Sequence, residues 1–204
     1  MRISRLAVLL ALFISSCASP APAPAPLDYP QLGKISLDVK DLTFVDRGIE
    51  QMPAAPVVKN LQPSVADALH IWASQRLQAV GGDGIAAFVV KNAYVTEEAL
   101  PAESSWFQRP QTGKLTGHVE IEFDARGKQG YALATANAAR SVTLSENPSD
   151  GEKQDAYNTL LSGMMQDLDK YLDQAIHDHM KDFIVNDPVI GSRLPTPESP
   201  GQSP

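Results

Sequence analysis

The chain has 204 residues and one cysteine, with 17 basic residues against 24 acidic ones, so its formal net charge is −7. Acidic chains are poor nucleic-acid binders, because binding requires clustered lysine and arginine to displace counterions. A single cysteine excludes an internal disulfide and a zinc site built from several cysteines.

Residues 1–16 are predicted to be an export signal. Arg2 and Arg5 precede an apolar run over residues 6–14, which is shorter than the roughly 20 apolar residues needed to span a bilayer. The segment ends with Ile14, Ser15 and Ser16, and Cys17 follows it. This motif resembles the lipobox of bacterial lipoproteins, and a thiolate is nucleophilic enough to accept a lipid group. A free reactive thiol or an intermolecular disulfide at Cys17 is the alternative.

The lipobox resemblance implies that Cys17 is acylated after residues 1–16 are removed, which anchors the chain to a membrane. Removal takes two arginines away, so the net charge becomes −9. Ala18 follows the cysteine, where aspartate would favour the inner membrane, so we expect the periplasmic face of the outer membrane. Residues 17–32 combine the acylated cysteine with an Ala/Pro-rich tether, which forms neither helix nor sheet because proline lacks an amide hydrogen.

The first half of the domain is predicted to contain a strand, a helix and a second strand. Alternating apolar residues predict the first strand over residues 35–39. Ser64 and Asp67 form a capping box that begins a helix, which continues to Gly81. Residues 85–95 begin with a continuous apolar run, which is typical of a strand in the middle of a sheet.

The second half is predicted to be a hairpin followed by one long helix. Alternation over residues 115–123, a turn at 124–128 and a strand over 130–144 indicate an antiparallel pair. Alanines at every second position from 132 to 138 would let a helix approach the sheet closely. Ser149 and Glu152 form a capping box at the start of a helix whose apolar spacing continues to Phe183.

These elements predict an α+β fold in which a mostly antiparallel four-stranded sheet carries two helices on one face, in the order β-α-β-β-β-α. We expect one such domain over residues 33–186 and a disordered Pro-rich tail over 187–204. The element order across residues 33–184, together with the lipobox, resembles the auxiliary lipoproteins of ABC-type transport systems that carry lipids between membranes. It is also similar to the lipopolysaccharide-assembly lipoprotein.

No residue pattern predicts catalysis, a metal or a cofactor. The serines occur in no Gly-x-Ser-x-Gly elbow. Asp173 and His177 lie four apart on the last helix and could share a metal, but His179 points elsewhere, so a solvated helix end is the better interpretation. We therefore expect no enzyme activity.

The resulting hypothesis is a non-catalytic outer-membrane lipoprotein that acts as an accessory of envelope lipid transport or outer-membrane assembly. It would contact an envelope protein through a sheet edge or through Trp106 and Phe107, which lie in a polar loop and could instead cover the core. The alternative is a lipoprotein that binds a small apolar ligand or lipid between its helices and sheet. Local patterns fix neither the order of the strands nor the oligomeric state.

Overall fold

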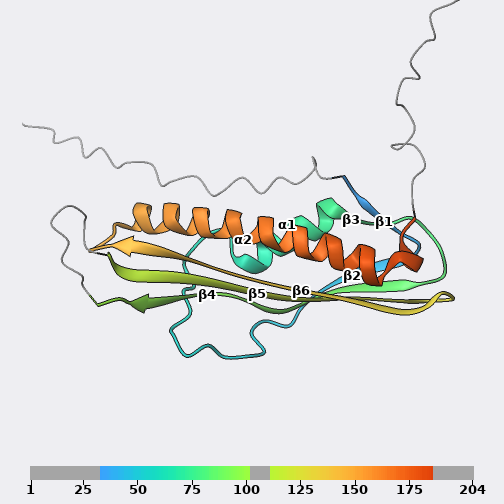
Figure 1. Ribbon diagram of the computed structural model, residues 1–204, viewed down its shortest axis with the longest axis horizontal. Helices are drawn as coiled ribbons and strands as arrows, with labels where there is room; N and C mark the ends of the chain where they lie inside the picture. Colours follow the sequence, from blue (N-terminus) through green and yellow to red (C-terminus); the bar gives the residue numbers. More distant parts are fainter. Residues whose placement is uncertain (1–32, 102–110, 186–204) are drawn as a thin grey trace, which may run out of the picture.

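The computed structural model describes residues 33–101 and 111–185, which form two layers (Figure 1). One layer is a four-stranded sheet, and the other consists of two helices on one face of it. The elements in chain order are β1 Ile35–Leu37, β2 Asp41–Asp46, α1 Val65–Arg76, β3 Leu77–Ala79, β4 Ile85–Ala99, β5 Gln111–Gly127, β6 Gly130–Ser145, α2 Asp150–His179 and the short 3-10 helix η2 Lys181–Phe183.

The large sheet has the order β2-β4-β5-β6, with β2 parallel to β4 and both other pairs antiparallel. This architecture confirms the predicted α+β fold and the predicted interior position of β4. The first strand differs from the prediction, since β1 pairs with β3 in a separate two-stranded parallel sheet. The large sheet instead begins at β2, a six-residue strand that the sequence analysis did not identify.

Helix α1 begins as predicted and ends earlier than predicted. The Ser64 side chain accepts from the Asp67 amide, and the Asp67 carboxylate accepts from the Ser64 amide, so the capping box is complete. The helix ends at Arg76 because Leu77 adopts extended angles, φ −104° and ψ 138°. Leu77 then pairs with Ile35, so a strand replaces the expected last turn.

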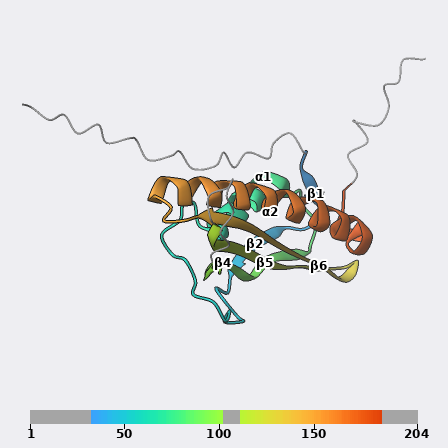
Figure 2. The ribbon, with the colours of Figure 1, turned by 60° about the vertical axis from the view of Figure 1, so that its left-hand side comes forward.

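Helix α2 lies along β6 and also contacts β5 (Figures 1 and 2). The predicted capping box at Ser149 and Glu152 is present, and the buried alanines of β6 let the helix approach closely. At Gly117 in β5, an added Cβ would lie 2.6 Å from Leu160 Cδ2, so side chains fill this interface. No helix in the described part of the chain is long and apolar enough to cross a bilayer.

A buried arginine joins the two helices. The Arg76 side chain is only 4% exposed, and its Nε and Nη2 lie 3.0 Å from Asp169 Oδ1 and 2.7 Å from Asp173 Oδ1. The indole Nε1 of Trp72 donates to the same Asp169 oxygen at 2.8 Å. Arg76 also donates to the carbonyl of Gly33, the first described residue. One guanidinium therefore links α1, α2 and the point where the chain enters the domain.

We predict that Arg76→Ala lowers the free energy of unfolding by about 3–5 kcal/mol, because it leaves partly buried carboxylates without their cation. Arg47 is the matched control, since its pair with Glu50 is exposed and its loss should cost less than about 1 kcal/mol. Urea denaturation followed by tryptophan fluorescence measures both. Equal losses of unfolding free energy in the two variants would contradict the role of Arg76 in joining the helices.

Candidate partner-binding surface

The strand order leaves one long sheet edge without a partner among the residues that the structure describes. Strand β6 is 16 residues long and lies at the end of the sheet. The other side of the sheet is covered, because residues beyond β2 continue along β4. There the Arg47 amide donates to the Val90 carbonyl and the Val58 amide to the Val95 carbonyl. We call the outer side of residues 130–145 the β6 edge.

The face of the sheet opposite the helices carries exposed apolar side chains near the β5–β6 turn. Ile85, Arg126 and Tyr131 form one cross-strand row, and Leu133 lies in the next row. Ile85, Tyr131 and Leu133 are 56%, 57% and 38% exposed, and the Arg126 guanidinium carbon lies 5.4 Å from the centre of the Tyr131 ring. These four residues are the open-face patch, and exposed apolar groups beside polar ones are typical of protein contact surfaces.

A shallow pocket of about 650 Å³ adjoins the open-face patch. Asp41, Thr43, Ala87 and Asp124 line it together with Arg126. Its lining offers both signs of charge, while Asp124 and Arg126 are already within 3.6 Å of one another. This surface can accept polar and apolar groups of a partner.

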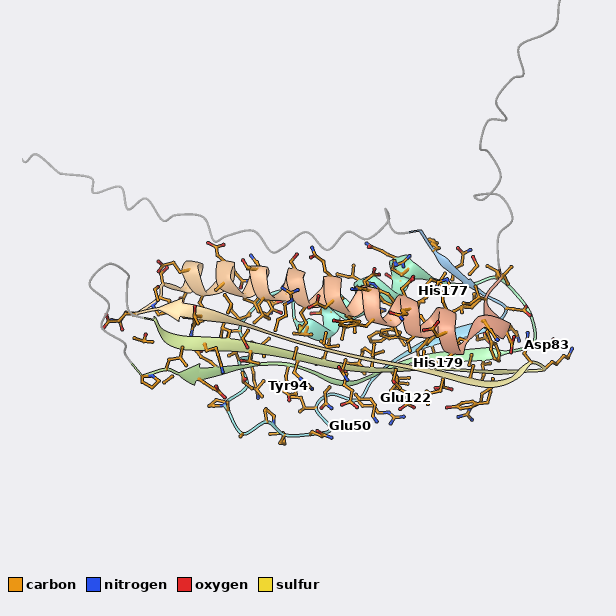
Figure 3. The ribbon with its side chains drawn as sticks, in the orientation of Figure 1. Glu50, Asp83, Tyr94, Glu122, His177 and His179 are labelled. Carbon is orange, nitrogen blue, oxygen red and sulfur yellow. The ribbon has the colours of Figure 1, made fainter. Side chains whose placement is uncertain are left out.

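Next to the open-face patch, the same face of the sheet carries a row of polar side chains. Figure 3 shows Glu50, Tyr94 and Glu122 on the side of the sheet away from α2. Lys91 Nζ lies 3.7 Å from Glu50 Oε2 and 3.6 Å from Glu122 Oε2. Buried Asn92 donates to Glu120 Oε2 at 2.8 Å and accepts from the Gln51 amide at 3.0 Å. These contacts hold the segment after β2 against β4.

The histidines and acids of the last helix form no metal site. His177 Nδ1 lies 2.8 Å from the Asp173 carbonyl and 3.4 Å from its carboxylate, as the four-residue spacing predicts. The Asp173 carboxylate, however, binds Arg76. Within residues 33–101 and 111–185, no group of three or more His, Cys, Asp or Glu side chains could hold a metal ion. His118 stacks on Tyr94, and His70 lies against Phe44.

The candidate residues named from sequence and those seen in the structure are different sets. Cys17, Trp106 and Phe107 lie outside the described residues, so their roles stay predictions. The sequence analysis missed Tyr131 and Leu133, although a signal was present, because both occupy positions of β6 that alternate with its buried alanines. Apolar residues at such outward positions indicate an exposed apolar surface. Met165 in α2 is fully buried.

We predict that Tyr131→Ser and Leu133→Ser each lower the free energy of unfolding by less than about 2 kcal/mol, because both side chains lie outside the core and bury only part of their area. Leu115→Ser, at a position that is 0% exposed, should cost more than about 3 kcal/mol as a matched control. Urea titration of the three variants measures this. A large loss of unfolding free energy on substitution at position 131 or 133 would show that the patch stabilises the fold instead of binding a partner.

No protein-family model matches the chain, and no curated protein matches it. Among solved structures, rare lipoprotein B from Shewanella oneidensis is similar at 9% identity and a TM-score of 0.35, with 68% of this chain and 96% of that chain covered. A neuraminyllactose-binding hemagglutinin homolog from Helicobacter pylori matches at 13% identity and a TM-score of 0.43, covering 77% and 97%. A minor lipoprotein from Acinetobacter baumannii matches at 12% identity and a TM-score of 0.36, covering 69% and 95%. Likeness at this level assigns neither a family nor a function to the chain.

Proposed function

We propose that this protein is a non-catalytic bacterial lipoprotein, anchored through Cys17 to the periplasmic face of the outer membrane. It acts as an accessory of envelope lipid transport or outer-membrane assembly by contacting an envelope protein. The observation that carries the proposal is the open-face patch, where three large apolar side chains are exposed on the face opposite α1 and α2. Exposed apolar side chains that gather beside polar ones favour a protein contact site.

The anchor and the patch fit together physically. A permanent membrane anchor needs more than one lipid chain, a condition that an acylated lipoprotein cysteine meets. The tether of residues 18–32 would rise by about 3.1 Å per residue, which keeps the domain within a few nanometres of the lipid. Confinement raises the effective concentration of a partner in the same membrane, so a modest patch suffices for binding.

We predict that cells expressing this protein incorporate labelled palmitate into it and that Cys17→Ser abolishes both the label and membrane fractionation. The reason is that the thiol is the acyl acceptor. Ser16→Ala is the control, since it leaves a small residue before the cysteine and should retain the label. A Cys17→Ser protein that still fractionates with membranes would contradict the anchor.

We predict that a photo-crosslinking amino acid at Ile85 or Arg126 yields a discrete adduct with an envelope protein in intact cells. Ser162 and Gln166 are matched controls, because they are exposed on α2 on the side opposite its buried stripe. They should yield no adduct. Adducts that are absent from all four positions, or equal at all four, would contradict contact through the patch.

A second candidate function is binding of a small apolar ligand. It would occupy a pocket of about 180 Å³ between α1 and β2, lined by Leu42, Phe44, Phe88 and Leu77 with His70 beside them. The space between α2 and the sheet is filled by Leu160 and Met164, so the α1–β2 pocket is the better site. Mass spectrometry of organic extracts from the purified full chain would show a stoichiometric lipid if this candidate is right.

A further inference from the structure

We propose that the β6 edge binds an extended, uncharged segment of another protein, which adds to the sheet as a fifth strand beside β6. This inference rests on the proposed function, in which the domain acts through protein contacts, and it specifies how one partner segment is recognised. The evidence comes from the backbone, from the side chains of β6 and from the position of α2.

The backbone of β6 offers a long series of hydrogen-bonding groups. In an antiparallel pair, alternate residues direct their N–H and C=O groups away from the neighbouring strand. The register between β5 and β6 is continuous from Gly113–Leu144 to Gly127–Gly130, so this series is not interrupted over most of the strand. Only an extended polypeptide presents donors and acceptors at the matching spacing, which determines the chemical class of the ligand.

The two sides of the sheet are protected differently. Strand β2 is only six residues long and has an aspartate at each end, and the edge of β4 beyond it is covered by residues 47–58. Short strands, charges and covering segments are the usual ways to block pairing. Strand β6 has 16 residues and no proline. Its outer edge has no partner in the part of the chain that the structure describes.

The only charged side chain of β6 is already neutralised. Arg140 donates to both carboxylate oxygens of Asp167 in α2, at 2.6 and 3.0 Å. The hydrogen bond and charge of Asp167 raise the pKa of Arg140, and the same hydrogen bond lowers the pKa of Asp167. This pair is bidentate and holds the guanidinium against the helix. An incoming strand therefore meets no free charge on β6.

The side chains of β6 that face away from the helices favour an uncharged ligand. They are polar without charge, small or apolar, and comprise Tyr131, Leu133, Thr135, Asn137, Ala139, Ser141 and Thr143. Side chains directly opposite one another on adjacent strands lie about 5 Å apart. A charged residue on the added strand would find no counter-ion in this row and would lose hydration on binding. The carboxylates behind the row on β5, Glu122 and Asp124, already pair with Lys91 and Arg126.

The position of α2 opposes pairing between the β6 strands of two copies of this chain. Helix α2 lies above β6 along much of its length (Figure 2). If two β6 strands paired, the strands would lie about 4.8 Å apart, and the two α2 helices above them would be brought to a similar separation. Packed helices need about 8–10 Å between their axes. A segment with no helix above it avoids this clash, so the β6 strand of a second copy is not the ligand.

The probe is a synthetic nine-residue peptide of alternating threonine and valine with a lysine at each end, added to the full acylated chain in detergent micelles. We expect saturable binding by fluorescence anisotropy and slower amide hydrogen exchange confined to residues 131–143. Thr135→Lys combined with Ala139→Lys should weaken binding at least tenfold, because edge lysines oppose strand addition. Thr135 and Ala139 are both exposed, so the new lysine side chains can reach solvent and the fold should persist.

Two controls test the recognition. Thr116→Lys places a lysine on the same face in the interior strand β5 and should change the affinity less than twofold. A peptide with lysine in place of each threonine should bind at least tenfold more weakly, although the chain is acidic. No binding of the threonine–valine peptide, equal binding by the double lysine variant, or tighter binding of the lysine peptide would each overturn the inference. Exchange protection of β6 that rises with protein concentration would overturn the exclusion of a second copy.

Failure of the inference and failure of the proposed function give different results. Adducts from Ile85 or Arg126 in cells without peptide binding at β6 would leave the accessory role and remove strand addition. Peptide binding at β6 without adducts from either position would leave strand addition and remove the accessory role proposed for the open-face patch. The two residues lie on β4 and β5, so the crosslinking result does not depend on β6.

Discussion

The arrangement of the domain depends on one buried guanidinium. Arg76 is nearly inaccessible, and it binds two carboxylates of α2 and the carbonyl of Gly33. An isolated buried charge is very costly, so these partners must be present whenever the core is closed. Because Trp72 shares the Asp169 oxygen, the indole of α1 and the carboxylates of α2 take fixed positions. The entry point of the chain is fixed with them.

This linkage leaves the two faces of the sheet with different roles. Both helices are held on one face, where the alanines of β6 and Gly117 of β5 allow α2 to pack closely. Part of the opposite face and the β6 edge have no covering segment among residues 33–101 and 111–185, and their exposed side chains contribute little to the core. We infer that folding and binding use separate parts of the same strands. In β6, the buried side chains would serve folding, and the exposed side chains that alternate with them would serve binding.

Local sequence signals predicted the elements that depend on neighbouring residues. The capping boxes at Ser64 and Ser149 and the alternation in the hairpin have short-range causes, and the structure contains them. The β1–β3 pair was not predicted, because each of these three-residue strands is defined by a partner about 40 residues away. The position of the free edge also depends on strand order, which no local pattern encodes. The open-face patch was visible only as apolar residues at outward positions.

The most direct test of this account is amide hydrogen exchange of the full chain alone, resolved to single residues by NMR. If the β6 edge is free, protection along residues 131–143 should alternate with a period of two, because only every second amide bonds to β5. Slow exchange at every residue of this stretch would show that another segment of the chain already covers the edge, and it would contradict the account.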